Sequence, residues 1–267
     1  MTTRSRLDSE LVRRGLARSR EQAAELIAAG RVTVAGQTAA KAATQVSRGA
    51  PVAVSAASDG AEYVSRGGHK LAGALAAFSG LAVAGRRCLD AGASTGGFTD
   101  VLLRAGAAHV VAVDVGYGQL AWSLRTDPRV TVLDRVNVRA LSPAQVAPPP
   151  EVVVADLSFI SLTLVLPALI GCAAPDADFA LMVKPQFELG KGRVGAGGVV
   201  RDPADRAEAV RSVCDAAKSL GLGVRGVTAS PLPGPAGNVE YFVWLRRGAP
   251  PLGEDDLLRA IETRPDA

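Results

Sequence analysis

The residues best suited to chemistry form an acidic, glycine-rich segment, Cys88-Leu-Asp-Ala-Gly-Ala-Ser-Thr-Gly-Gly-Phe98. An apolar run precedes its acid, and a helix-like run, residues 98–104, follows its glycines. A strand, a Gly-rich turn and a helix in this order present backbone N–H groups and a helix N-terminus to a ligand. The glycine spacing differs from that of dinucleotide-binding folds, and no lysine follows as in a phosphate loop.

An acid at a strand end and glycines without a basic partner suit a cationic cofactor that carries no phosphate, and S-adenosylmethionine is such a molecule. A second acid supports this interpretation, because the strand-like run 110–113 ends at Asp114, 24 residues after Asp90. An acid meets a cofactor ribose at an interval of ~20 residues. Asn137 follows the next strand-like run, where an adenine edge would be read. An ordinary tight turn between strand and helix is the alternative for the glycines alone.

Two further strand-like runs end in ionised residues: residues 152–155 lead into Asp156, and residues 179–183 lead into Lys184. Strand and helix patterns alternate through this region, which predicts a mostly parallel sheet. The ligand crevice of such a sheet lies at the carboxyl ends of its strands. Each charge taken alone is also explained as an ordinary surface loop charge.

The composition favours a globular protein of the reducing cytoplasm. The chain has 267 residues, of which 48% are hydrophobic and 4% aromatic, so the core must consist mainly of Ala, Val and Leu. The three cysteines, Cys88, Cys172 and Cys214, form no C-x-x-C pair, which argues against a disulfide framework or a structural zinc site. The N-terminus has no apolar signal segment.

One uncharged stretch, residues 157–175, is nearly long enough to span a bilayer. It contains serine, threonine, proline and glycine, and it follows a strand-like run. We therefore expect a buried loop and helix packed on the sheet rather than a membrane span.

The positive charge is concentrated at the N-terminus. Residues 1–60 contain nine bases and five acids, which is the whole net charge of +4, and the other 207 residues contain 21 of each. This asymmetry indicates a basic module joined to a neutral body. The module shows helix patterns at residues 7–12 and 23–29, the second opened by a capping box at Ser19, and strand patterns at residues 31–34 and 51–54.

This N-terminal pattern resembles the RNA-binding module first seen in ribosomal protein S-four. The resemblance rests on Arg6-Leu7-Asp8, Gly15, Ser19-Arg20, Ala24, Ile27, Gly30 and Val32-x-Val34-x-Gly36. A solvated helix face is the alternative explanation for the arginines. A linker follows, and Arg66, His69 and Lys70 then stand just before an expected apolar helix over residues 71–78.

The whole chain is similar to the haemolysin A (TlyA) family of ribosomal RNA 2′-O-methyltransferases, whose body resembles the FtsJ-type ribose methyltransferases. The matching stretches are Ser65–Leu71, Leu89–Thr99, Asp114–Leu120, Ala155–Ser161, Val183–Glu188 and Gly237–Phe242, in family order. The resemblance implies an α/β fold with a Rossmann-like class I methyltransferase sheet and a small N-terminal α+β RNA-binding domain. The expected domains are residues 1–60 (S-four-like), 61–65 (linker) and 66–267 (methyltransferase).

The resemblance also implies the site residues. The family's catalytic tetrad corresponds to Lys70, Asp156, Lys184 and Glu240. The implied S-adenosylmethionine contacts are Asp90, Gly92, Ser94, Gly96, Gly97, Phe98, Asp114, Asn137, Asp156 and Phe159. The implied contacts to ribosomal RNA or ribosomal subunits are Arg4, Arg6, Arg20, Lys41, Arg66, Arg135 and Lys191. No metal and no membrane are expected.

The tetrad fits the transfer of a methyl group to a ribose 2′-OH, which is a poor nucleophile until its proton is removed or strongly hydrogen-bonded. Lys184 is assigned to that hydroxyl, Lys70 and Glu240 to its support, and Asp156 to orienting the lysines near the methyl-bearing sulfonium. The early start Arg4-Ser-Arg-Leu7 resembles the subtype that methylates cytidine in both 16S and 23S ribosomal RNA. The linker departs from the family, because Ala61-Glu62-Tyr63-Val64 replaces Arg-x-Trp-Val.

Three other functions stay open at this point. The family name suggests a pore-forming haemolysin, although the sequence has no clear membrane span. A non-catalytic assembly factor that binds ribosomal RNA would not need an intact tetrad. A nicotinamide oxidoreductase is disfavoured by the glycine spacing.

Overall fold

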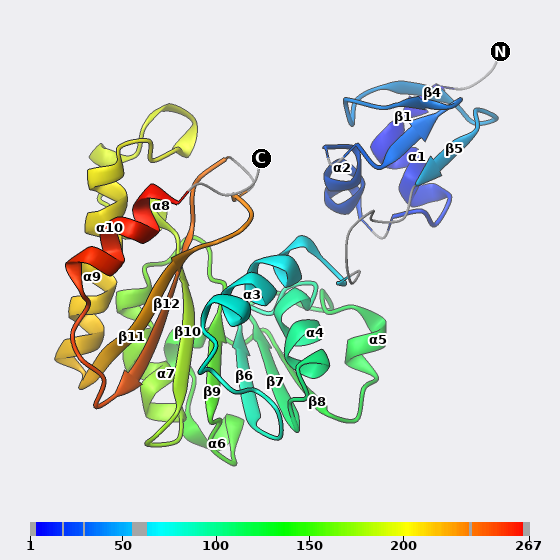
Figure 1. The fold of residues 1–267 in the computed structure, drawn as a ribbon. Coiled ribbons are helices and arrows are strands. Elements are labelled where there is room, and N and C mark those ends of the chain that lie inside the picture. Colours follow the sequence, from blue (N-terminus) through cyan, green and yellow to red (C-terminus); the bar gives the residue numbers. More distant parts are fainter. Residues whose placement is uncertain (1–3, 18, 29, 55–62, 235–236, 264–267) are drawn as a thin grey trace. The chain divides into compact units, whose positions relative to one another are not determined.

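The computed structural model describes residues 4–17, 19–28, 30–54, 63–234 and 237–263, and the chain divides into two compact units, residues 1–62 and 63–267 (Figure 1). The first unit contains β1 (Arg4–Arg6), α1 (Leu7–Arg13), α2 (Arg20–Ala28), β2 (Val32–Val34), β3 (Gln37–Thr38), β4 (Gln45–Ser47) and β5 (Val52–Val54). Its strands pair antiparallel, β1 with β4 and β2 with both β3 and β5. Apolar residues four apart on each helix, Leu7 with Leu11 and Ala23 with Ile27, pack into a small core.

The second unit is built on a seven-stranded sheet of order β11-β12-β10-β9-β6-β7-β8. The strands are β6 (Arg87–Ala91), β7 (His109–Asp114), β8 (Val130–Asp134), β9 (Val152–Ala155), β10 (Asp178–Val183), β11 (Leu222–Ala229) and β12 (Tyr241–Arg247). Neighbours from β10 to β8 are parallel, and β12 is antiparallel to both β10 and β11. The predicted α/β fold with a mostly parallel sheet is confirmed.

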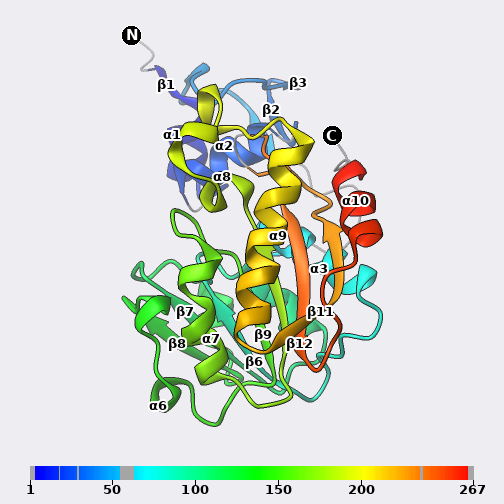
Figure 2. The ribbon, with the colours of Figure 1, turned by 90° about the vertical axis from the view of Figure 1, so that its left-hand side faces the viewer.

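Helices cover both faces of this sheet (Figures 1 and 2). One core contains residues of α3 (Arg66–Ala77), α4 (Gly97–Arg104) and α5 (Trp122–Arg125), and the other contains residues of α6 (Pro143–Val146), α7 (Leu166–Cys172), α9 (Pro203–Ser219) and α10 (Glu254–Glu262). Successive residues of a strand point to opposite faces of the sheet, so that Val153 of β9 lies in one core and Val154 in the other. The short elements are η1 (Val138–Ala140), η2 (Leu162–Leu164), α8 (Pro185–Glu188), η3 (Lys191–Arg193) and η4 (Ala196–Gly198).

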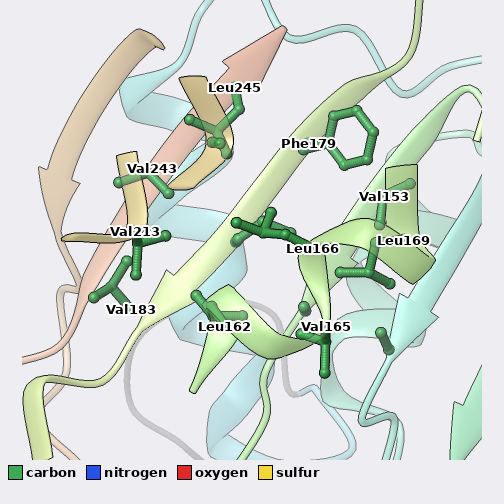
Figure 3. Packing of buried hydrophobic residues seen from close by; sticks show 14 of the residues in the cluster. Val153, Leu162, Val165, Leu166, Leu169, Phe179, Val183, Val213, Val243 and Leu245 are labelled. Carbon is green, nitrogen blue, oxygen red and sulfur yellow. The ribbon is translucent and has the colours of Figure 1, made fainter. Parts of the chain in front are cut away.

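The uncharged stretch 157–175 forms a loop and helix that pack on the sheet, as its composition predicts, although Phe159 and Leu164 are exposed. Leu162 of η2, Leu166 and Leu169 of α7, and Val165 between these helices lie in the core shown in Figure 3. Within the described ranges, no helix combines the length and the apolar character that crossing a membrane requires.

Helix α3 begins at Arg66, five residues before the start expected from the apolar pattern. Arg66, His69 and Lys70 therefore lie in its first turns rather than before it. Glycine is a poor helix former, so Gly68 argues against a helix that starts at Arg66. Packing explains this glycine, because a Cβ on Gly68 would lie 2.4 Å from the side chain of Tyr63. Close approach of the chain overrides the poor helix propensity of glycine here.

Candidate active site

The sheet topology brings the predicted strand-end residues to one edge. Ala155 of β9 is paired with Ala91 of β6 and with Leu181 of β10, so the parallel strands end together. Strand β12 runs the other way, and its first residue, Tyr241, is paired with Val183, the last residue of β10. The residues adjoining these positions are Asp156, Lys184 and Glu240, which therefore meet at this edge.

The Gly-rich loop between β6 and α4 requires its glycines. Gly92 has φ +86°, and a Cβ there would lie 2.5 Å from the carbonyl oxygen of Asp156. Gly96 has φ +100°, and a Cβ there would lie 2.3 Å from Leu124. Both positions combine a left-handed backbone with close contact, so any larger residue is strained. Gly97 then begins α4, on which Phe98 is buried.

Asp114, at the end of β7, fixes this loop through backbone amides. One of its carboxylate oxygens accepts a hydrogen bond from Ser94 N at 2.7 Å, and the other accepts one from Gly116 N at 2.7 Å. Ser94 itself has φ +47°, which the bond to Asp114 helps to hold. Asn137 is exposed, and its side-chain oxygen accepts a hydrogen bond from Arg139 N at 3.0 Å and caps η1.

Asp90 is fully buried, and Thr99 Oγ1 donates a hydrogen bond to its Oδ2 at 2.6 Å. Its Oδ1 has no hydrogen-bond partner among the described atoms. Burial raises the pKa of this carboxyl to about 7, against the partial effect of the Thr99 hydroxyl. Asp90 is thus bonded to α4, the helix that follows the Gly-rich loop. Its predicted contact with a cofactor stays a prediction.

The four tetrad residues form two ion pairs. Lys70 Nζ lies 2.5 Å from Glu240 Oε2, and both side chains are buried. Lys184 Nζ lies 2.5 Å from Asp156 Oδ1 and donates a hydrogen bond to Ser158 Oγ at 3.0 Å. The second Glu240 oxygen, Oε1, is buried without a hydrogen-bond partner in the described part of the chain. Ionised side chains of both signs therefore lie at the carboxyl ends of the parallel strands, where the ligands of open α/β sheets bind.

Exposed aromatic side chains stand on the loops that follow β9 and β7. Phe159 has φ +64° and is 92% exposed, and its ring centroid lies 5.2 Å from that of Phe187. Tyr117 is 66% exposed, and the guanidinium of Arg135 lies 4.3 Å from the centre of its ring. Both groups belong to the same edge of the sheet as the ion pairs, so an extended ligand could contact them.

The predicted RNA contacts of the first unit lie around one buried acid. Arg6 and Arg20 both form ion pairs with Asp8, at 2.9 and 3.0 Å. The backbone N–H of Asp8 donates to the carbonyl oxygen of Ala42, so the exposed residue Lys41, directly before Ala42, lies next to the segment that contacts Asp8. Arg4 is exposed and lies two residues before Arg6 on β1, on the same side of the strand.

The other three predicted RNA contacts are in the second unit, and one of them, Arg135, lies over the ring of Tyr117. Arg66 is the first residue of α3, and its Nε is buried without a hydrogen-bond partner among the described atoms. Lys191 begins η3, but its side chain lies outside the part of the chain that the structure describes.

Three site residues were missed by the sequence analysis: Ser158, Glu188 and Asn238. Ser158 contacts Lys184, and Glu188 accepts hydrogen bonds from Ser161 and Leu162. Asn238 is buried, accepts a hydrogen bond from Val200 N and donates one to the carbonyl oxygen of Gly198, each at 2.8 Å. All three lie inside the stretches that carry the family resemblance, which is the signal that could have found them.

The Gly-rich loop offers no basic partner to a phosphate. Its Ser94 N–H binds the Asp114 carboxylate, Gly92 lies against the backbone carbonyl of Asp156, and residues 92–97 contain no basic side chain. Among the described residues there is no group of three or more His, Cys, Asp or Glu that could hold a metal ion.

Comparison with known proteins agrees with this geometry. The FtsJ-like methyltransferase family matches residues 63–247, and the S4 domain matches residues 5–52. The "16S/23S rRNA (cytidine-2'-O)-methyltransferase TlyA" of Mycobacterium tuberculosis is 62% identical, over 99% of this chain and 100% of that protein. "Hemolysin A" of Brachyspira hyodysenteriae is 36% identical over 89% of this chain and 98% of its own length. A solved structure, "Putative hemolysin from Streptococcus thermophilus", has a TM-score of 0.78 at 36% identity, with 98% of this chain and 95% of that chain covered.

The fold and the edge site thus define a methyltransferase with an N-terminal S4 domain. The chain belongs to the FtsJ-like methyltransferase family and, within it, to the TlyA group.

Proposed function

We propose that this protein transfers a methyl group from S-adenosylmethionine to the ribose 2′-OH of cytidine in ribosomal RNA. The observation that carries the proposal is the meeting of Lys70, Asp156, Lys184 and Glu240 as two ion pairs at the sheet edge. The Mycobacterium tuberculosis relative, named for this reaction on 16S and 23S rRNA, supports the choice of substrate.

The Gly-rich loop and Asp114 would hold the cofactor. Gly92 and Gly96 allow close approach of the backbone, and Asp114 keeps the loop in place while its carboxylate accepts hydrogen bonds from a ribose. The Asp156 carboxylate would provide negative charge to stabilise a sulfonium. When bound, S-adenosylmethionine supplies an electrophilic methyl group on a positively charged sulfur.

Lys184 would act on the ribose hydroxyl. Asp156 and Ser158 hold its Nζ at the sheet edge. There Lys184 would hydrogen-bond the ribose oxygen, and in its neutral amine form it would accept the 2′-OH proton as that oxygen takes the methyl group. The buried Lys70–Glu240 pair adjoins it across the β10–β12 register and keeps the charge of this edge balanced. Oxygen and methyl must be held about 3 Å apart, so positioning supplies much of the rate.

The S4 domain would dock the enzyme on the ribosomal RNA backbone. Arg4, Arg6, Arg20 and Lys41 can neutralise phosphates, which fixes position and register but reads little sequence. Arg66, Arg135 and Lys191 would contact RNA nearer the transfer site.

The test combines purified full-length protein, S-adenosylmethionine with a radioactive methyl group and purified small and large ribosomal subunits. We expect cofactor binding by calorimetry and methyl incorporation into RNA. A non-catalytic assembly factor would bind subunits without incorporation, which would contradict the proposal.

A further inference from the structure

Two loops at the sheet edge carry the transfer residues. The loop after β9 runs from Asp156 to η2, and the segment after β10 runs from Lys184 through α8. Near their strand ends the loops are joined by the contacts of Lys184 with Asp156 and Ser158. Further out they are joined by the rings of Phe159 and Phe187.

Glu188, the last residue of α8, makes the outermost connection. Its Oε2 accepts a hydrogen bond from Ser161 Oγ at 2.5 Å, and its Oε1 accepts one from Leu162 N at 2.8 Å. Both carboxylate oxygens therefore bind the end of the loop that begins at Asp156. Ser161 in turn accepts a hydrogen bond from Thr163 N and caps η2, so the loop's far end is fixed to a buried helical turn.

The loop between these attachments holds an unfavourable conformation. Phe159 has φ +64°, although its ring is 92% exposed. A bulky residue in the left-handed region is strained and persists only where its surroundings over-determine it. The Phe159 ring contacts Phe187 but is otherwise almost fully exposed, so its packing supplies little of that constraint. The attachments on either side of Phe159, to Lys184 and to Glu188, can supply it.

We propose that Glu188 is a positioning residue for methyl transfer, which locks the loop of residues 156–162 to α8 and so sets Asp156 and Phe159 relative to Lys184. This inference rests on the proposed function. It assigns Glu188 no contact with cofactor or RNA, so its effect on the reaction passes through the loop. An error of about 1 Å in such positioning can cost about 100-fold in rate.

The placement of a carboxylate here is not explained by stability. Burial raises the pKa of Glu188, because its neutral donors, Ser161 and Leu162, only partly offset the loss of water. A carboxyl whose pKa is raised in the folded state lowers the free energy of unfolding once the pH exceeds its usual pKa. A glutamine would make similar contacts without that cost, which makes Glu188→Gln a useful variant.

The experiment compares the wild type with Glu188→Ala, Glu188→Gln and Ser161→Ala, and uses Glu262→Ala as a control on the exposed face of α10. Single-turnover methyl transfer to ribosomal subunits is measured at saturating cofactor, together with cofactor affinity by calorimetry. We expect Glu188→Ala to lose about 10- to 100-fold in rate with cofactor affinity nearly unchanged. Glu188→Gln should recover most of the rate, because its amide can accept from Leu162 and donate to Ser161.

A wild-type rate in Glu188→Ala, or an equal loss in Glu188→Gln, would overturn the inference. If Glu188→Ala does not fold, Ser161→Ala removes one of the two donors and should still slow transfer, and an unchanged rate in that variant would overturn the inference too. Amide hydrogen exchange at Leu162 separates this proposal from the proposed function, since it requires no RNA. Exchange should accelerate in Glu188→Ala even if no substrate is methylated. Unchanged exchange would refute the proposal that Glu188 holds the loop of residues 156–162.

Discussion

Two carboxylates of the first unit, Asp8 and Glu10, and two of the second unit, Asp90 and Glu188, have different hydrogen-bond partners. In the first unit, Asp8 accepts hydrogen bonds from Arg6 and Arg20, and the Arg6 guanidinium holds the pKa of Asp8 well below its usual range. Glu10 is bound by Arg13 and Arg14 with the same effect on its pKa. In the second unit, the hydrogen bonds to Asp90 and Glu188 come from hydroxyl and amide groups, and burial raises the pKa of both acids.

This difference separates acids that support folding from acids that oppose it. A lowered pKa contributes stability that is present above the usual carboxyl pKa and lost as the pH falls. A raised pKa has the opposite sign, so Asp90 and Glu188 cost stability at neutral pH. Groups that oppose folding are concentrated at functional sites, where geometry matters more than stability. Thr99, which binds Asp90, lies on the helix that follows the Gly-rich loop, and Glu188 binds the end of the loop after β9, so both of these acids support loops of the candidate site.

The largest expected effect is that of Lys184→Ala. It removes the group assigned to the RNA hydroxyl and leaves Asp156 without its lysine. We expect methyl transfer to fall by about 10²–10⁴-fold while cofactor affinity measured by calorimetry stays nearly normal. Lys218→Ala, an exposed lysine on α9, is the control and should retain full activity. A near-normal single-turnover rate in Lys184→Ala would remove this lysine from the mechanism.

Asp90→Asn tests whether the buried Asp90 carboxyl lowers the stability of the fold at neutral pH. With a pKa of about 7, the wild-type carboxyl is protonated at pH 5 and ionised at pH 8. The loss of folding stability caused by Asp90 therefore grows as the pH rises from the usual pKa of an aspartate to about 7. Relative to wild type, the variant should gain on the order of 2–4 kcal/mol between those two pH values. Urea unfolding at both pH values measures this gain, and the same difference at pH 5 and pH 8 would show that Asp90 does not titrate as the contrast requires.

Gly92→Ala tests the Gly-rich loop of the second unit. Its Cβ would meet the carbonyl oxygen of Asp156 at 2.5 Å, so the loop must shift. We expect cofactor affinity to fall by roughly 10-fold or more, which corresponds to the 1–3 kcal/mol of a strained backbone. Gly85→Ala is a matched control, because Gly85 also has a positive φ, +74°, but has open space where a Cβ would lie. Equal losses of affinity in both variants would attribute the effect to backbone strain alone.

The smallest effect is expected for Arg20→Ala in the first unit. Asp8 keeps Arg6 as a partner, so the unit should stay folded. Loss of one phosphate contact should weaken subunit binding a few-fold and reduce the slope of log affinity against log salt by about one. Arg13→Ala, which removes a similar arginine from the buried Glu10, serves as the matched control. An unchanged salt slope for Arg20→Ala would exclude Arg20 from the RNA contact.

The overall fold was largely predictable from the sequence, since apolar runs mark most strands of the large sheet. Residues 110–113, 152–155 and 179–183 lie within or coincide with β7, β9 and β10. The position of β12 between β10 and β11 was not predictable, because strand order depends on contacts distant in sequence. The short strands β1, β3 and β4 contain few apolar residues and show no strand pattern of their own.

The candidate site was predictable only in part. Asp156 and Lys184 follow from their places at strand ends, whereas Lys70 and Glu240 came from family resemblance alone. Their ion pair joins residues 170 positions apart, which no local pattern can indicate. Glu188 was missed because its contacts depend on the left-handed conformation at Phe159, which the propensity of phenylalanine opposes.

The central claim is that the sheet edge transfers a methyl group to a ribose oxygen of cytidine. The most direct measurement is nucleoside mass spectrometry of ribosomal RNA after purified subunits react with wild-type protein or with Lys184→Ala. We predict 2′-O-methylcytidine with the wild type and a loss of about 10²–10⁴-fold in its rate of formation with the variant. A methyl group on a base, or equal formation of 2′-O-methylcytidine by both proteins, would contradict the account.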